Sequence, residues 1–462
     1  MRPLEVVLLL LILLGLLRPF LLRHPWLDWL LLTPIPLTLF HWLLEGPRWQ
    51  MIPAYGFVIL LAVGAIGRLR HQPAWPRGRQ IAGALLGLIL FIPAAALPYL
   101  LPVPQPLPPS GPYAIGTFTL HRVDQSRREI YSDDPTARRE LLLQIWYPAD
   151  PNPDDVTAPY LEHSHIFGPA LANFFELPPF LFNHINLART AAFTNAPMAP
   201  GNQVYPLILF SHGLNGFRGQ NTTIVQELAS YGYIVATVDH TYGNVVSIFP
   251  DGRSIFRSPD LFSEEGDPPR TGQTLVQVWA EDLAFTLDEL ARLNDTTAGG
   301  MNGRIDLSRV GIFGHSTGGG ATLTLCQQDP RCTAGLALDS WLIPTPDDIE
   351  TNPPPQPFMF INTPAWISPE NTTRGQRIIE AMPDQALLLT IAGADHFDFS
   401  DLPLFSPLTH QLGLTGTING ELMTEILNRH VLAFFNSTLR GQDSDLLLAS
   451  PYEEVTLVSN GR

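Results

Sequence analysis

The most constraining feature of this chain is a serine set between two glycines, where an apolar run meets a helix-compatible stretch. The run 310–314 leads into His315, Ser316, Thr317 and Gly318. A serine hydroxyl becomes an effective nucleophile when a sharp strand-to-helix turn exposes it to a base, and glycines on either side relieve the crowding of that turn. Ser316 is therefore the candidate nucleophile. The alternative is a glycine-rich turn that contains an incidental serine.

The acid and the base of such a site each have a candidate, in the order Ser, Asp, His that α/β-hydrolases use. Asp339 ends the apolar run 334–338, which puts a carboxylate at the carboxyl edge of the predicted sheet. His396 follows the apolar stretch 387–395 and comes just after a predicted strand. Asp339 is therefore the candidate acid and His396 the candidate base. Rivals in the same half of the chain stay open, namely Asp347, Asp348, Asp384 and Asp395 for the acid and His410 and His430 for the base.

Two backbone amides are candidates for binding the oxyanion that forms in the reaction. The buried run 205–211 ends in His212 and Gly213, the kind of loop from which α/β-hydrolases take one N–H group. Leu214 is the candidate for that group. Thr317, the residue after the nucleophile, is the candidate for the second, and it lies at the positive end of the helix that begins there.

Short apolar runs alternate with helical stretches through the rest of the chain. Runs that are apolar throughout indicate strands buried on both faces, and the helices between them are the crossovers of a parallel sheet. The predicted fold class is therefore α/β, an α/β-hydrolase fold with a largely parallel central sheet flanked by helices. Strands are expected at 115–120, 141–147, 207–211, 234–239, 310–314, 334–339, 358–362 and 387–392, and helices at 223–231, 274–293, 321–327 and 420–435.

Two segments interrupt this alternation. Residues 160–193 are rich in Phe, Leu and Pro, which fits a helical cap, a wall of the substrate site, a membrane-touching patch or a plain packing insert. Residues 241–273 are rich in Gly, Pro, Asp and Ser but lack the ordered ligand spacing of a calcium loop. We expect a solvated loop there.

The first hundred residues have the composition of membrane helices. Residues 81–101 form an uncharged apolar run, long enough to cross about 30 Å of hydrocarbon, and 51–67 form a second, shorter run. Arg18 interrupts the run 6–22, and Asp28 and two prolines interrupt the run 25–44. We expect four transmembrane helices, with three as the alternative. No small-x-small cleavage site follows the first run, so an anchor is favoured over a cleaved signal peptide.

Arginine placement predicts the orientation of these helices. Arg68, Arg70, Arg77 and Arg79 lie between the third and fourth runs, which makes that loop cytoplasmic. We therefore expect an integral protein of the plasma or inner membrane whose catalytic domain is extracytoplasmic. The predicted order is a transmembrane anchor at 1–101, a Pro-rich linker at 102–112 and a catalytic domain at 113–462.

The charge of the chain argues against nucleic acid as a partner, and its two cysteines argue against a zinc site. Residues 1–101 hold 8 arginines against 3 acids, and the remainder holds 19 arginines against 40 acids, within a chain of net charge −16 that has no lysine. An acidic domain argues against nucleic acid as a partner. Cys326 and Cys332 lack the spacing and histidine partners of a zinc site. They are close enough for a small disulfide in an exported domain, and two buried free thiols are the favoured alternative.

Several motifs together resemble the plasma-type, calcium-independent platelet-activating-factor acetylhydrolases, which are lipoprotein-associated phospholipases A2. The resemblance implies an α/β-hydrolase whose nucleophile is Ser316, whose acid is Asp339 and whose base is His396, with oxyanion amides at Leu214 and Thr317. Thr317 stands where the family usually has Phe, and apolar segments replace the family's secretion signal. The motifs are Gly111-Pro-Tyr-Ala-Ile-Gly, Tyr205-Pro-Leu-Ile-Leu-Phe-Ser-His-Gly-Leu, Gly314-His-Ser-Thr-Gly-Gly, Ala337-Leu-Asp-Ser-Trp and Pro355-Gln-Pro-Phe-Met-Phe-Ile-Asn.

These observations predict a membrane-tethered serine ester hydrolase that removes short or oxidised sn-2 acyl chains from phospholipids through an acyl-enzyme. We expect no cofactor and no metal. The expected partners are the membrane and a phospholipid or other ester substrate. Two alternatives remain: a general carboxylesterase or polyesterase that uses the same residues, and a non-catalytic, membrane-anchored homologue that binds ligands.

Overall fold

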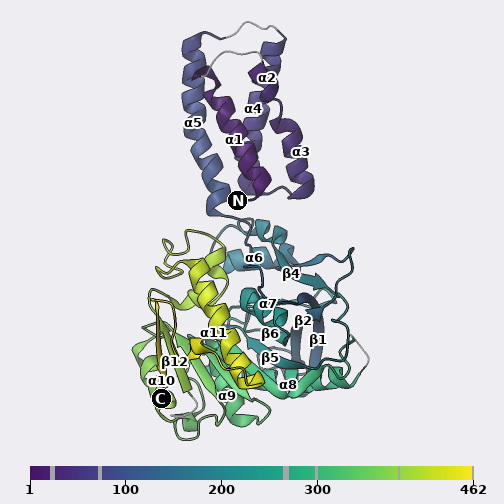
Figure 1. Ribbon diagram of the computed structural model, residues 1–462, viewed down its shortest axis with the longest axis vertical. Helices are drawn as coiled ribbons and strands as arrows, with labels where there is room; N and C mark the ends of the chain where they lie inside the picture. Colours follow the sequence, from purple (N-terminus) through teal and green to yellow (C-terminus); the bar gives the residue numbers. More distant parts are fainter. Residues whose placement is uncertain (21–25, 71–74, 264–269, 297–299, 383–385, 460–462) are drawn as a thin grey trace. The chain divides into compact units, whose positions relative to one another are not determined.

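The computed structural model describes residues 1–20, 26–70, 75–263, 270–296, 300–382 and 386–459. The chain separates into two compact units (Figure 1). The first, here called the helical unit, comprises Met1–Pro104, Leu181–Ala188 and Phe405–Leu408. The second, here called the sheet unit, comprises Gln105–Phe180, Arg189–Leu404 and Thr409–Arg462.

The helical unit contains three helices that are long and apolar enough to cross a membrane, at Pro3–Phe20, Trp49–Leu69 and Arg77–Leu100. The fourth expected crossing is shorter, and its apolar helical part spans Asp28–Leu44. Two helices share this stretch, because Pro34 opens the second of them and a proline is tolerated in the first turn of a helix but not in its interior. Leu22 and Pro25, at the edges of two predicted runs, lie outside the described residues. The helices are α1 (Pro3–Leu17), α2 (Trp26–Leu30), α3 (Pro34–Leu44), α4 (Ile52–Leu69) and α5 (Arg77–Leu100).

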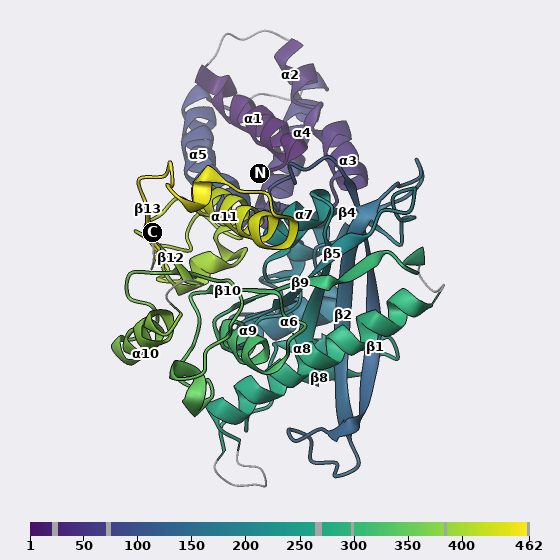
Figure 2. The same ribbon diagram turned by 60° about the horizontal axis from the view of Figure 1, so that its bottom comes forward.

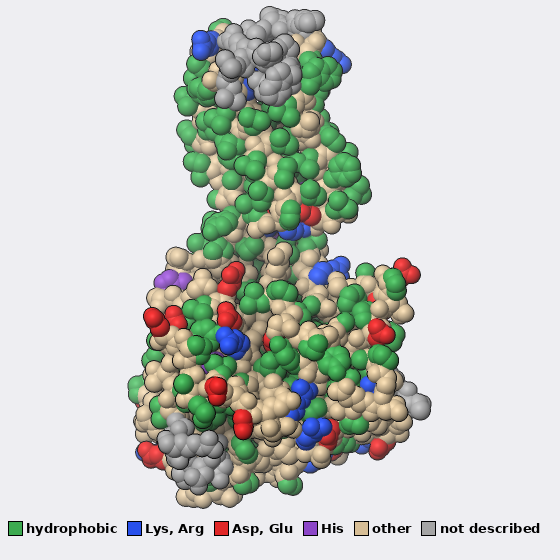
Figure 3. Space-filling model, in the orientation of Figure 1, with side chains coloured by type: hydrophobic (Ala, Val, Ile, Leu, Met, Phe, Trp, Pro, Cys, Tyr) green, Lys and Arg blue, Asp and Glu red, His purple; other side chains and the backbone are tan. Residues whose placement is uncertain are grey.

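Two ion clusters lie at opposite ends of α1. Glu5 is fully buried between two guanidinium groups, and Asp28 also accepts from two arginines. The surface over these helices is mostly hydrophobic, and the charged side chains in view gather near its ends (Figure 3). An apolar flank with charges confined to the ends is the distribution that a bilayer-spanning bundle requires. The contacts are Arg48–Glu5 at 2.7 Å, Arg2–Glu5 at 2.8 Å, Arg18–Asp28 at 2.9 Å and Arg68–Asp28 at 2.7 Å.

The sheet unit is built on one sheet whose strand order is β13-β12-β11-β10-β9-β5-β6-β2-β1-β4-β3. Its centre, from β12 to β6, is parallel, and β2 and β13 pair antiparallel on either side of that centre. All eight predicted runs form strands of this sheet, which makes the fold a largely parallel α/β sheet as expected. The corresponding strands are β1 (Ala114–Arg128), β2 (Arg138–Ala149), β5 (Tyr205–Ser211), β6 (Ile234–His240), β9 (Ile305–His315), β10 (Ala334–Leu338), β11 (Phe358–Asn362) and β12 (Ala386–Ile391).

Helices cover both faces of the sheet. Apolar side chains of α8 (Gly272–Asp295), α9 (Thr317–Gln328) and α10 (Pro369–Glu380) pack in one buried cluster. Those of α7 (Thr222–Ser230) and α11 (Gly420–Arg440) pack in the cluster on the other face (Figure 2). The parallel strands therefore end together at one edge of a sheet that is buried on both sides, and loops at that edge can combine side chains from several strands.

The structure corrects the expectation of a solvated loop at 241–273. Residues Val246–Ile248 (β7) and Ser254–Phe256 (β8) form a two-stranded hairpin, and its apolar side chains Val245, Val246 and Phe249 are buried. Residues 264–269 of this segment lie outside the described residues. The segment 160–193 forms helix α6 (Ser164–Phe174) and strand β4 (Arg189–Thr194), which pairs with β1 and with β3 (Thr157–Pro159), so part of it extends the sheet.

Cys326 and Cys332 form a disulfide that joins the end of α9 to the approach of β10, with their Cα atoms 5.1 Å apart. The expectation of two free thiols was therefore wrong. The two cysteines are six positions apart in the sequence, and the turn at Asp329 brings their side chains together, since the amide of Cys332 donates to the Asp329 carbonyl at 3.1 Å. The remaining new strand, β13 (Val455–Ser459), pairs with the outer side of β12.

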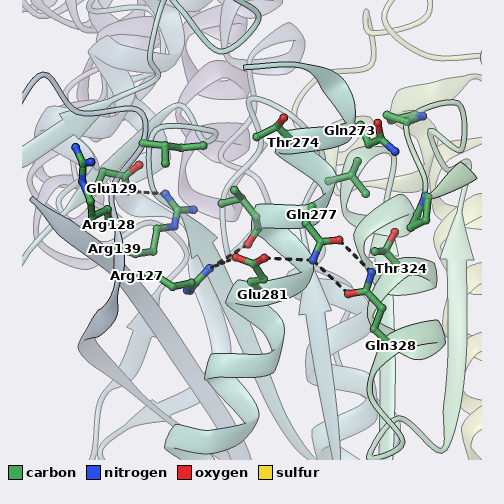
Figure 4. A pocket seen from close by; sticks show the side chains of 15 residues that line it. Arg127, Arg128, Glu129, Arg139, Gln273, Thr274, Gln277, Glu281, Thr324 and Gln328 are labelled. Atoms are coloured by element: carbon green, nitrogen blue, oxygen red, sulfur yellow. Dashed lines mark hydrogen bonds and ion pairs between the residues drawn. The ribbon is translucent and has the colours of Figure 1, made fainter. Parts of the chain in front are cut away.

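A buried ion network ties β2 to α8. Arg139 is 1% exposed and contacts Asp282 at 2.5 Å and Glu129 at 2.8 Å, while Arg127 reaches Asp282 at 2.9 Å. Burial by itself would raise the pKa of Asp282, but the two guanidinium groups hold it below its usual value. The network borders a cavity of about 580 Å³ between α8 and α9 (Figure 4). Some of its polar side chains bind one another, as Gln277 and Gln328 do at 3.2 Å.

Replacing Arg139 with methionine should lower the free energy of unfolding by about 3–5 kcal/mol, because the change leaves the Asp282 carboxylate buried with less compensating charge. Denaturant unfolding of the full chain in detergent, followed by tryptophan fluorescence, measures this. Arg253→Met is the matched control, since that side chain is 48% exposed and its ion pairs should be worth less than about 1 kcal/mol. Equal losses in the two variants would contradict the assigned role of the network.

Candidate active site

Ser316 lies in a strained turn between β9 and α9. Its backbone has φ 53° and ψ −119°, a conformation that non-glycine residues rarely adopt. A Cβ atom at Gly314 would overlap the backbone of Gly318, and a Cβ atom at Gly318 would overlap the carbonyl groups of Ser211 and His212. The glycines predicted to relieve crowding are therefore required by the close approach of α9 to β5, and the turn they allow exposes the Ser316 hydroxyl.

The structure brings the three sequence-predicted side chains together. His396 Nε2 lies 3.1 Å from Ser316 Oγ, and His396 Nδ1 lies 2.7 Å from Asp339 Oδ2. The buried carboxylate accepts from Nδ1–H, which leaves the Nε2 lone pair facing the serine hydroxyl. His396 keeps 27% of its side chain exposed and begins the turn η6 (His396–Phe399). This arrangement lets the imidazole take a proton from Ser316 while the carboxylate fixes the tautomer.

Asp339 is held by donors from the neighbouring strand end. Its second carboxylate oxygen accepts from the backbone N–H of Thr363 at 2.9 Å and from the Thr363 hydroxyl at 3.0 Å. The residue has φ 35°, so the chain turns sharply where β10 ends. Thr363 was missed in the sequence analysis, and its position directly after β11 is the signal that could have indicated it.

The rival residues lie elsewhere or have other partners. Asp347 and Asp348 are in the turn η5 (Asp347–Glu350), and Asp384 lies outside the described residues. Asp395 precedes the base and caps its turn, accepting from the amide of His396 at 2.7 Å. The ring Nδ1 of His430 bonds to the Ile426 carbonyl and that of His410 to the Thr415 carbonyl. Asp339 and His396 are thus the acid and histidine that meet Ser316.

The two predicted oxyanion amides are also positioned by the elbow. Leu214 follows the end of β5, and Thr317 is the first residue of α9. Within the part of the chain that the structure describes, neither amide donates to another protein atom. Two free N–H groups beside a nucleophile, one of them at a helix N-terminus, can stabilise a developing oxyanion.

A second Ser–His–Asp arrangement is buried behind this site. Ser211 Oγ lies 2.8 Å from His240 Nε2, and His240 Nδ1 lies 2.9 Å from Asp282, with all three side chains fully buried. The His240 ring stacks on Trp279 with centroids 4.2 Å apart. Burial lowers the pKa of His240, as it does more strongly for the neighbouring His212. A fully buried hydroxyl is out of reach of a substrate, so this arrangement is a packing contact between β5, β6 and α8.

Asp401 is a buried carboxyl group two residues beyond η6. It lies 3.1 Å from the Tyr160 hydroxyl and accepts from the amide of Thr223 at 3.3 Å. Burial raises its pKa to about 7, more than the bonds from Thr223 and Tyr160 lower it. Asp401 therefore ionises near neutral pH at a position that connects α7 to the turn carrying His396.

The sheet order, the elbow and the strand-end positions of Asp339 and His396 define an α/β-hydrolase. Comparison with known proteins identifies the family: the model described as "Platelet-activating factor acetylhydrolase, isoform II" matches residues 106–247 and 292–446. The chain belongs to this family, and it is a serine ester hydrolase.

Similar proteins agree with this assignment. "Platelet-activating factor acetylhydrolase" of Cavia porcellus is 27% identical over 73% of this chain and 82% of its own length. "Probable 1-alkyl-2-acetylglycerophosphocholine esterase" of Arthroderma benhamiae is 26% identical over 79% of this chain and 96% of its own length. Among solved structures, a ferulic acid esterase from Streptomyces cinnamoneus aligns with a TM-score of 0.64 and 28% identity, over 77% of this chain and all of that one.

Exchanging each serine of the two Ser–His–Asp arrangements for alanine should distinguish them. Ser316→Ala should lower kcat by about a millionfold, as the loss of a serine nucleophile does in other hydrolases. Ser211→Ala should stay within about tenfold of the wild type, because it removes one internal hydrogen bond. Hydrolysis of a soluble acetyl ester by both purified variants is the measurement. An active Ser316→Ala protein would contradict the assignment of the nucleophile.

Asp401→Asn should stabilise the protein more at pH 8 than at pH 5. The folded chain holds the Asp401 proton up to about pH 7, whereas the unfolded chain releases it near 3.8, so this group's contribution to stability falls as pH rises through that window. The gain from the variant should grow by about 2–3 kcal/mol between the two pH values. Denaturant unfolding of both proteins at the two pH values measures this difference in the free energy of unfolding. A gain that is independent of pH would contradict the raised pKa of Asp401.

Proposed function

We propose that Ser316, His396 and Asp339 are the catalytic triad of an esterase that removes short sn-2 acyl chains from glycerophospholipids at a membrane. The observation that carries the proposal is the continuous chain of contacts from Ser316 Oγ to His396 to Asp339, at 3.1 Å and 2.7 Å. A non-catalytic role would leave no reason for a strained serine, a paired histidine and a buried carboxylate to meet.

The mechanism follows from these contacts. His396 Nε2 accepts the proton of Ser316 as the serine oxygen attacks the ester carbonyl carbon, and the amides of Leu214 and Thr317 bind the resulting oxyanion. The Asp339 carboxylate stabilises the imidazolium that forms. The imidazolium then gives its proton to the leaving alcohol, which leaves an acyl group on Ser316. Water, activated by the same histidine, releases the acid and restores the serine.

The substrate class is inferred from the relatives. Both curated relatives carry names that denote hydrolysis of the acetyl ester of an alkyl-acetyl-glycerophosphocholine. An acetyl or similarly short or oxidised acyl chain at sn-2 is therefore the proposed substrate. Thr317, buried at the start of α9, presents a smaller side chain than the Phe usual in the family, and we expect it to modify the acyl-chain preference.

Location at a membrane is supported by the three long apolar helices and by the arginines at the end of α4 and the start of α5. Those arginines favour a cytoplasmic loop, so that α5 leads outward to an extracytoplasmic catalytic domain. The Cys326–Cys332 disulfide is consistent with this side, because disulfides persist in oxidising compartments. We propose the predicted division into an anchor at 1–101, a linker at 102–112 and a catalytic domain at 113–462.

A general carboxylesterase is the second candidate. It is favoured by the alignment of the whole ferulic acid esterase chain with this fold. The same triad would serve it, so the two candidates differ in the acyl and alcohol groups that the site accepts.

The full chain in detergent micelles should hydrolyse an sn-2 acetyl phospholipid more than about 100-fold faster than the matched sn-2 palmitoyl lipid. Activity should persist in EDTA and be absent from Ser316→Ala. Lysophospholipid formation, measured by mass spectrometry, compares the two lipids. Cleavage of soluble aromatic esters without cleavage of either lipid would instead favour the general carboxylesterase.

The absence of lysine makes the topology testable with amine chemistry. Arg377→Lys, at a side chain that is 61% exposed in α10, should react with a membrane-impermeant amine reagent on intact cells. Arg77→Lys, at the exposed start of α5, should react after permeabilisation. Peptide mass spectrometry separates each introduced lysine from the N-terminal amine. Labelling of Arg77→Lys but not Arg377→Lys on intact cells would reverse the proposed orientation.

A further inference from the structure

The side chain of Gln220 lies between the two loops that the reaction must align. Gln220 follows the oxyanion loop and precedes α7. Its Oε1 accepts from the amide of Gly213 at 3.1 Å, and its Nε2 donates to His315 Nδ1 at 2.8 Å. His315 Nε2 in turn donates to the carbonyl oxygen of His396 at 3.0 Å. A continuous chain of hydrogen bonds therefore runs from the residue before Leu214 to the base.

The neighbours of Gln220 determine which way its amide points. The Gly213 N–H can only donate, so it requires Oε1 on that side. On the other side, Nε2 also donates to Asn221 Oδ1 at 3.1 Å, and Asn221 is itself oriented because its Nδ2 donates to the Phe399 carbonyl at 2.7 Å. A flipped amide would place donor against donor at Gly213, so the network admits one orientation.

His315 transmits this orientation to the base. Its ring is 2% exposed and lies against the ring of His396, with centroids 4.6 Å apart and planes inclined by 35°. Nδ1 accepts from Gln220 and Nε2 donates to the His396 carbonyl, which describes a neutral imidazole. Burial, and then the charge of His396, hold the pKa of His315 well below its usual value. The ring thus acts as a rigid neutral spacer beside a histidine that becomes charged during the reaction.

A second set of contacts connects the same two loops. The amide of Asp401 donates to the backbone carbonyl of Gln220 at 2.9 Å, and Asn221 contacts Phe399 in η6 as described above. The short stretch 213–221 therefore supplies the oxyanion amide of Leu214 at one end. At the other end it is hydrogen-bonded to the turn that carries His396 and to Asp401 just beyond it. Within this stretch, the side chain of Gln220 contacts both end residues, Gly213 and Asn221.

We propose that Gln220 and His315 are positioning residues that hold the oxyanion amide of Leu214 and the imidazole of His396 in a fixed relation. This inference rests on the proposed catalytic triad. Both groups act on the same carbonyl, since one binds its oxygen and the other moves a proton at the attacking serine. A displacement of about 1 Å between such groups can lower a rate about 100-fold, although neither positioning side chain touches the substrate.

The test compares Gln220→Leu, His315→Phe and the double variant in the full chain, with p-nitrophenyl acetate as the probe. His315→Phe keeps the ring contact with His396 and removes both hydrogen bonds. Each single variant should lower kcat by about 10- to 100-fold while KM stays within about threefold. Because both residues act through one chain of hydrogen bonds, the kcat of the double variant should be no more than about threefold below that of the less active single variant.

Gln144→Leu is the control, because that glutamine is buried and bonds to Thr117 Oγ1 at 3.1 Å but belongs to β1–β2 packing. It should reduce thermal stability without lowering kcat. Folded single variants with kcat within threefold of the wild type, or effects that multiply in the double variant, would overturn the inference. If Gln220→Leu does not fold, the kcat values of His315→Phe and Gln220→Met relative to the wild type test the inference instead. An inactive wild type would instead contradict the proposed function.

Discussion

The fold of the active site depends on the close approach of the α9 N-terminus to the carbonyl ends of β5. Gly318 lies so near Ser211 and His212 that a Cβ atom has no room, and Gly314 lies equally near Gly318. This contact forces Ser316 into its positive-φ conformation and brings the Thr317 amide beside the predicted oxyanion loop. Parallel strands that end at one edge then deliver Asp339 and His396 to the same point.

Beneath this edge, the structure keeps buried polar groups in defined charge states. Burial lowers the pKa of His212, His240 and His315 and so favours their neutral forms, and each has a specific backbone or side-chain partner. The buried carboxylates of Asp282 and Asp239 are each compensated by an arginine, Arg139 and Arg218 respectively. In the proposed mechanism such neutral neighbours matter, because they leave Asp339 as the partner that balances the charge on His396.

The fold and the three side chains that meet at the elbow could be predicted from the sequence because their signals are local. Continuous apolar runs marked the central strands, and the glycines around Ser316 marked the elbow. The positions of Asp339 and His396 after strands followed from the same pattern. The supporting residues could not be predicted. Gln220 has no motif, since its role arises when α7 and η6 meet in space, and His240 meets Asp282 through packing of β6 on α8. The hairpin at 246–256 was missed because its buried side chains lie within a stretch of loop composition.

The most direct test of the central claim is covalent labelling of the full chain with a fluorophosphonate, followed by peptide mass spectrometry. Such reagents modify a serine whose hydroxyl is activated by a base and whose oxygen product is stabilised by an oxyanion site. The account predicts a single adduct on Ser316, formed in parallel with loss of esterase activity and much more slowly in His396→Ala. An adduct on another serine, or complete inactivation with Ser316 unmodified, would contradict it.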